Sequence, residues 1–115
     1  MKQNPRQNIM KTQSRKYLLT VAATFYYSEN QIKVNHIEGK IKLTKDSLVF
    51  IASTKTDRLY KKEILLNEIV DIVKKNSLGL IPNILIIKTH KGDFKFAVYA
   101  REQLVRLILQ LQKNE

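Results

Sequence analysis

The chain has 115 residues, a mass of 13.4 kDa and a formal net charge of +11. This length accommodates one domain with one core, which excludes an enzyme with a cleft between two lobes. The absence of cysteine excludes disulfides, thiol nucleophiles and thiolate metal sites. The excess of Lys and Arg favours polyanionic partners, such as an anionic membrane surface or nucleic acid, although a compositional bias toward Lys, Asn and Ile explains the charge equally well.

The positive charge is concentrated in two segments. Residues 1–16 contain five basic residues, no acid, and only Ile9 and Met10 as internal apolar residues. Because such a segment has little apolar surface to bury, we predict a disordered basic N-terminal arm at 1–16 and one folded domain at 17–115. The second basic segment covers residues 33–62, where eight Lys or Arg oppose three acids.

Residues 17–27 are largely apolar and follow the basic arm, so they imitate the start of a signal peptide. The segment is too short to cross a bilayer as a helix. Its Tyr, Val, Thr and Phe favour a β-strand. We therefore predict the first strand here, and we expect no transmembrane segment elsewhere in the chain.

Short alternating or wholly apolar runs follow, which is typical of strands in an all-β domain. They cover residues 39–44, 48–52, 59–66, 69–73, 83–89 and 94–99. Turn signals separate them, namely residues 45–47, a bend between Gly79 and Pro82, and the pair Lys91-Gly92. In the second strand, Ile41 and Leu43 point to one face, and Lys40 and Lys42 to the other.

The period changes after Ala100. Leu104, Leu107, Ile108 and Leu111 fall on one face of a helix that extends to about residue 113. Six to seven antiparallel strands followed by one C-terminal α-helix predict a mainly β fold, and a pleckstrin-homology-like small barrel capped by the helix fits this order best.

Val105 and Leu109 lie beside the apolar arc of the predicted helix. If both are partly exposed, they offer a surface for a homodimer or for a partner helix. The competing interpretation is that strand edges or the N-terminal arm cover them.

Several short motifs resemble the GRAM domain family, especially its short bacterial members. Residues 39–44 (GKIKLT) with 48–50 (LVF) resemble the G-K-L-x-L-T and R-L-v-F signature, and 66–69 (LNEI) resemble P-L-x-E-I. Residues 75–83 resemble K-x-N-x-L-G-x-x-P-N, and 94–96 the strand before the helix. The resemblance covers about residues 17–113 and departs at Leu65, where proline is usual. It implies a pleckstrin-homology-like, membrane-associated binding module.

The sequence offers little for catalysis. His36 precedes the second predicted strand and His90 lies at a hairpin turn, so no pair of histidines has metal-ligand spacing. Carboxylates occur singly, and the three glycines lie far apart, which excludes a phosphate-cradling loop. We therefore predict a protein that is not an enzyme and has no cofactor, metal or catalytic residue.

The basic residues are the remaining functional signal. In lipid-binding relatives of the barrel, the connections between the first two strands and between the third and fourth stand at the rim left open by the helix. The resemblance thus implies an anionic-lipid-binding site formed by Lys33, Lys40, Lys42, Lys55, Arg58, Lys61 and Lys62, with His36 nearby. Weak, salt-sensitive binding to phospholipid headgroups is expected. The alternative is a merely solvated face.

Two other partners stay open. A protein-protein interaction module, using a strand edge or the helix face, is the alternative function. Nucleic-acid binding has thinner support, because Tyr26, Tyr27 and Tyr60 are the only aromatic residues near the basic rim. The expected location is the cytoplasm, peripherally at the inner face of the membrane.

Overall fold

The computed structural model describes residues 16–28, 34–53 and 60–113. It consists of seven strands, a 3₁₀ turn and one α-helix: β1 (Leu19–Ser28), β2 (Val34–Leu43), β3 (Ser47–Ala52), β4 (Lys61–Leu65), η1 (Leu66–Glu68), β5 (Ile69–Ser77), β6 (Ile81–Thr89), β7 (Gly92–Val98) and α2 (Arg101–Lys113). The predicted fold class is confirmed. The predicted arm at 1–16 lies outside the described residues except for Lys16.

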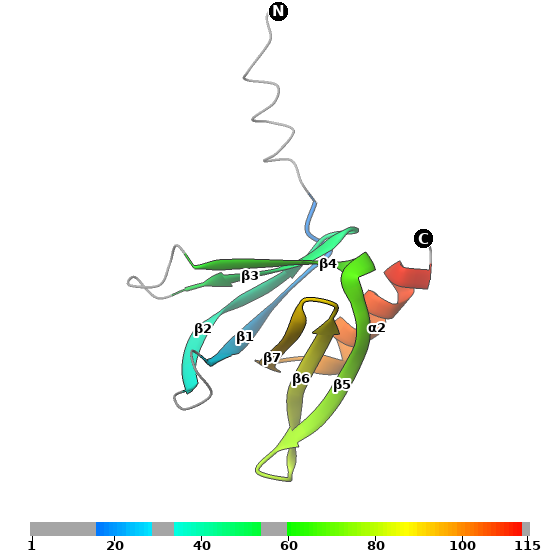
Figure 1. Ribbon diagram of the computed structural model, residues 1–115. Coiled ribbons are helices and arrows are strands. Elements are labelled where there is room, and N and C mark those ends of the chain that lie inside the picture. The colour runs from blue at the N-terminus through cyan, green and yellow to red at the C-terminus, as the bar shows by residue number, and fades with distance from the viewer. Residues whose placement is uncertain (1–15, 29–33, 54–59, 114–115) are drawn as a thin grey trace, which may run out of the picture.

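All seven strands form one antiparallel sheet in the order β4-β3-β2-β1-β7-β6-β5. Figure 1 shows that the sheet curls, with β3 and β4 along one side and β5 and β6 along the other, so that it forms a half-barrel. Helix α2 contacts β6 and η1, and it closes part of the barrel interior. This is the helix-capped, pleckstrin-homology-like arrangement predicted from the order of elements.

The core lies on the concave face of the sheet. Ile41 and Leu43 are fully buried there, together with Phe50 of β3, Phe96 of β7 and Leu104 of the helix. Lys40 and Lys42 alternate with these β2 residues and point outward, as predicted. One continuous hydrophobic cluster includes residues from both edge strands of the sheet, and their packing against each other stabilises the curl.

Gly39 marks the closest approach of two strands. A Cβ at this position would collide with the carbonyl oxygen of Ile51 on β3. The glycine therefore permits the tight pairing of β2 with β3.

The start of the helix is anchored by a buried arginine that the sequence analysis did not single out. The Arg101 Nη1 atom donates to the carbonyl oxygens of Lys75 (2.8 Å) and Ile84 (3.1 Å), which are paired residues of β5 and β6. Its Nε and Nη2 atoms donate to the Glu102 carboxylate. A hydrogen bond from Lys74, reinforced by that from Arg101, holds the pKa of Glu102 below its ordinary value.

Of the two alternatives for the flank of the helix, coverage applies to Val105 and exposure to Leu109. Val105 is buried in the core cluster, whereas Leu109 is 53% exposed. Ile69 and Ile72 of β5 lie beside both, around a small hollow of about 350 Å³. Because β5 covers Val105, the two residues do not form one exposed face for a dimer or a partner helix.

The region around Gly79 also differs from the prediction. β5 continues to Ser77, and Ile81 and Pro82 already belong to β6 instead of to a bend. The β5–β6 ladder has a register shift between Lys75 and Ser77. Pro82 is tolerated in the strand because it lies opposite this irregularity, where a regular ladder hydrogen bond is not required.

Candidate functional site

Three of the predicted lysines lie together on the convex face of the sheet. Lys40 of β2 pairs with Ile51 of β3, which in turn pairs with Lys61 of β4. Residues that pair across strands point to the same face, so Lys40 and Lys61 share one row. Lys42 lies two residues further along β2 on the same face. We call this set, Lys40, Lys42 and Lys61, the outer basic face.

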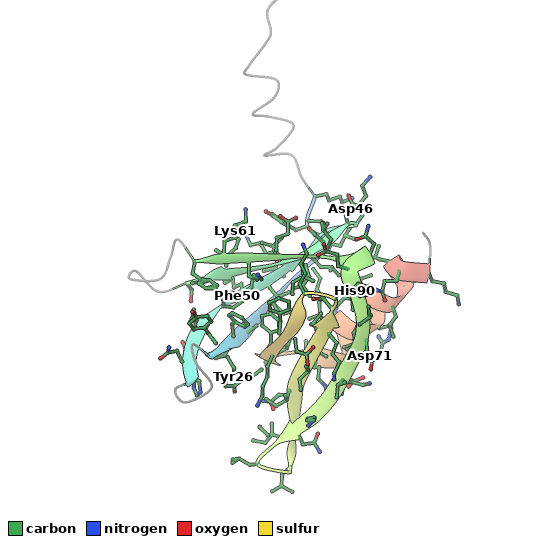
Figure 2. The ribbon with its side chains drawn as sticks, viewed as in Figure 1. Tyr26, Asp46, Phe50, Lys61, Asp71 and His90 are labelled. Carbon is green, nitrogen blue, oxygen red and sulfur yellow. The ribbon has the colours of Figure 1, made fainter. Side chains whose placement is uncertain are left out.

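Lys62 does not belong to the outer basic face. It pairs with Phe50, whose side chain is fully buried on the concave face. The Lys62 Nζ atom lies 4.8 Å from the centroid of the Phe94 ring. Figure 2 shows Lys61 and Phe50 on opposite sides of the sheet. Adjacent residues of a strand point to opposite faces, so Lys61 and Lys62 cannot serve one surface.

Lys42 is partly engaged by an aromatic neighbour. Its Nζ atom lies 4.8 Å from the centroid of the Tyr17 ring, and the backbone N–H of Leu18 donates to the carbonyl oxygen of Leu43 at 2.7 Å. Residues 16–18 therefore run beside the end of β2. The chain that carries the basic residues of segment 1–16 joins the domain next to the outer basic face.

Lys33, Lys55 and Arg58 lie outside the described residues. Their flanking residues are described: Ser28 pairs with Val34, and the N–H of Ala52 donates to the carbonyl oxygen of Tyr60 at 3.1 Å. Figure 1 shows that the β1–β2 and β3–β4 hairpins end on the same side of the molecule, away from α2. Both connections thus begin and end at the part of the half-barrel that the helix leaves uncovered.

A further basic residue lies on the convex face and was not among the predicted site residues. The Lys95 Nζ atom lies 5.1 Å from the centroid of the Tyr26 ring, and that ring contacts His36 edge-on at 4.7 Å between centroids. Tyr26 pairs with His36 on one side and with Lys95 on the other. The alternation of Lys95 with Phe94 and Phe96 was the signal that could have identified it.

Acidic residues reduce the charge of the convex face without cancelling it. Glu38 is exposed two residues from Lys40 on β2, Glu63 shares the row of Lys42 through Val49, and Asp93 precedes the inward-facing Phe94 on β7. Against these three carboxylates stand Lys40, Lys42, Lys61 and Lys95. The convex side of the described strands β1 to β4 and β7 is therefore positive on balance.

Two of the three tyrosines named as possible base-stacking residues lie elsewhere. Tyr60 is half-buried on the concave side, with its ring centroid 5.8 Å from that of Phe25. Burial raises the pKa of the Tyr60 hydroxyl above its ordinary value of 10.0, and the nearby Tyr27 raises it further. Tyr27 stacks toward Tyr60 at 6.5 Å. Tyr60 packs against the core cluster, and Tyr27 is exposed beside it.

A hollow with a volume of about 830 Å³ lies where β7 ends. Its floor consists of small residues of β1, β2 and β7, including Ala22, Gly39 and Ala97, and Tyr99 and Ile81 stand at its side. Within the described ranges, no group of three His, Asp or Glu side chains could hold a metal ion. His90 lies apart from this hollow, at the exposed β6–β7 turn.

A comparison with solved structures found a likeness of fold. The structure resembles the crystal structure of the C-terminal domain of an unknown protein from Leishmania infantum, with a TM-score of 0.69 and 18% identity over 92% of each chain. At this identity the likeness shows the fold alone. No family model matches the chain, and no curated protein matches it either. In the described part of the chain, α2 is too short to cross a membrane.

Proposed function

We propose that this domain is a non-catalytic, GRAM-type module that associates peripherally with anionic membranes through the outer basic face. The observation that carries the proposal is the register of β2, β3 and β4, which gathers Lys40 and Lys61 in one row with Lys42 beside it. A broad, convex and positive surface suits many headgroups at once better than it suits one small ligand.

The expected strength follows from the number of cations. Each Lys or Arg near an anionic membrane contributes about 1 kcal/mol. The candidate cations are those of the outer basic face together with Lys95, Lys33, Lys55 and Arg58. If four to six of these cations act together, they would supply roughly 4–6 kcal/mol. This free energy corresponds to dissociation constants from about millimolar to tens of micromolar. Such binding is reversible and falls with ionic strength.

The alternative is a protein-interaction module that binds at a sheet edge. β4 and β5 are the edge strands, so either could accept an added strand. β4 is short and carries Lys61 and Lys62, which are features that discourage edge pairing. This function is therefore the second candidate.

The test is sedimentation with vesicles of phosphatidylcholine alone and of equimolar phosphatidylcholine and phosphatidylglycerol, over a salt series. The test variant carries Lys40→Glu, Lys42→Glu and Lys61→Glu. A control with the same change of net charge carries Lys91→Glu, Arg106→Glu and Lys113→Glu, which are exposed residues away from the convex face. Only the first variant should lose binding, while both should unfold cooperatively.

Two results would contradict the proposal: equal binding to neutral vesicles, or equal loss in both triple variants. Single-stranded DNA added as a competitor distinguishes the nucleic-acid alternative. If DNA binds more tightly than anionic vesicles at the same salt concentration, the partner is nucleic acid instead of a membrane.

A further inference from the structure

The turn between β5 and β6 exposes a concentrated apolar group. Leu78 is 90% exposed, Leu80 83% and Ile81 50%. Figure 1 shows that this hairpin extends away from the rest of the domain. We call these three side chains the apolar tip. They are separate from the outer basic face, and the core does not use them.

The backbone of the turn adopts a left-handed conformation that does not favour leucine. Leu78 has φ 53° and Gly79 has φ 73°, and the N–H of Leu80 donates to the carbonyl oxygen of Ser77 at 3.1 Å. These are the features of a type I′ hairpin turn, in which Asn, Asp or Gly is strongly preferred at the first central position. A leucine there is unfavourable in conformation and gains no burial, so neither turn formation nor packing explains it.

The charge around the apolar tip indicates what it contacts. Lys75 of β5 is the basic residue nearest the apolar tip, whereas Lys74, Lys88 and Lys91 form ion pairs with Glu102, Asp93 and Glu68. Lys75 is exposed on β5, about 10 Å along the strand from Leu78, given a rise of about 3.3 Å per residue. Aliphatic side chains with an exposed lysine behind them match the layers of a bilayer, in which anionic headgroups lie outside the acyl chains.

The small size of the apolar tip argues against a second copy of the chain as its partner. A stable protein interface buries about 800 Å² on each partner. Three side chains on one projecting turn expose far less than that. A bilayer has no such requirement, because each aliphatic group that enters the acyl region contributes independently.

We propose that the apolar tip inserts into an anionic bilayer and provides the component of membrane binding that does not depend on salt. The inference rests on the proposed association with anionic membranes, but it does not rest on the outer basic face. Leu78 and Leu80 enter the boundary between headgroups and acyl chains, and Lys75 stays at the level of the lipid phosphates.

The decisive variant is Leu78→Asn. Asparagine suits the left-handed first position of the turn, so the stability of the domain should be kept or increased. Partitioning into vesicles of equimolar phosphatidylcholine and phosphatidylglycerol should nevertheless weaken about tenfold, because one leucine no longer leaves water. The control is Leu109→Asn, which removes an exposed leucine from the helix and should leave partitioning unchanged.

A fluorescent probe tests insertion directly. The chain has no tryptophan, so Leu80→Trp introduces a single reporter at the apolar tip, and Leu109→Trp is its control. With the same vesicles, emission of the first variant should shift to shorter wavelength and be quenched by lipids brominated in their acyl chains. The control should do neither.

The outcomes separate this inference from the proposed function. If the Leu80→Trp variant sediments with vesicles but keeps the emission of a solvent-exposed tryptophan, insertion of the apolar tip is overturned. The outer basic face is then the contact. An emission shift that survives the Lys40, Lys42 and Lys61 reversals supports insertion by the apolar tip independently of the outer basic face. Absence of vesicle binding by the unaltered chain contradicts both proposals. If the unaltered chain self-associates and the Leu78→Asn variant does not, the turn forms a protein contact, which overturns insertion.

Discussion

The Nζ atom of Lys62 lies 4.8 Å from the centroid of the Phe94 ring, and this contact joins two strands that are not neighbours in the sheet. β4 and β7 are separated by β3, β2 and β1 in the strand order. The contact therefore crosses the interior of the half-barrel and helps to hold its curl. Because the Lys62 charge is directed at a ring of the concave face, Lys62 is a structural residue within the second basic segment.

A double-mutant cycle measures this contact. We expect the Lys62→Met and Phe94→Leu changes to be coupled by about 0.5–1 kcal/mol in the free energy of unfolding, the range of a partly exposed cation–π pair. Urea denaturation of the four proteins gives the coupling. Lys61→Met is the matched control, because its side chain lies on the opposite face and should show no coupling to Phe94. Additive effects of the first pair would refute the interior contact.

Replacement of Arg101 should lower the free energy of unfolding of the domain strongly, because the side chain is buried and hydrogen-bonded. Arg101→Met removes both hydrogen bonds to the carbonyl oxygens of Lys75 and Ile84, and we expect a loss of about 2–3 kcal/mol in the free energy of unfolding. Arg101→Lys should recover part of it. Arg106→Met, on the exposed side of the same helix, should change stability by no more than about 0.5 kcal/mol. Equal effects at the two positions would contradict the anchoring role.

Gly39→Ala tests the close approach of β2 and β3. The added methyl group would meet the Ile51 carbonyl oxygen, so the strands must separate, and we expect destabilisation of about 1–3 kcal/mol or more. The neighbouring exposed change Glu38→Ala should have little effect. A thermal unfolding midpoint that is the same for both variants would mean that the strands can adjust without cost.

The pKa of Tyr60 predicts a specific pH dependence. Because burial raises this pKa above 10.0, the folded chain keeps a proton that the unfolded chain releases. The unfolded state thus binds fewer protons, and the free energy of unfolding decreases as the pH rises past 10.0 toward the folded-state pKa. Below the unfolded-state pKa this contribution is fully present.

Tyr60→Phe removes the titrating group and should flatten that part of the profile. The measurement is urea denaturation from neutral pH to above 10.0, with Tyr99→Phe as a control because the Tyr99 side chain is exposed. Parallel profiles for the unaltered chain and Tyr60→Phe would show that Tyr60 is not the responsible group.

Much of the fold was predictable because it depends on local periodicity. Alternation in β2 identified Ile41 and Leu43 as core residues and placed Lys40 and Lys42 on the opposite face, and the change of period after Ala100 identified the helix. The burial of Leu104 and Ile108 follows from the same periodicity. These features need no information about which strands meet.

The assignment of Lys61 and Lys62 shows where local periodicity stops. Alternation requires that these two residues point to opposite faces, but it does not say which one points inward. The pairing of Lys62 with Phe50 decides that. Lys62 therefore lies on the concave face, and the pairing of β7 with β1 places Lys95 on the convex face.

The sequence by itself determined the number and kind of elements, the two basic segments and the apolar face of α2, because each is written in the spacing of neighbouring residues. Only the tertiary structure decided that β5 covers Val105, that Arg101 bridges β5 and β6, and that Leu78 and Leu80 project from a left-handed turn. The physical reason is that burial and exposure are set by contacts between residues far apart in the chain, and these contacts depend on strand register and on the curl of the sheet.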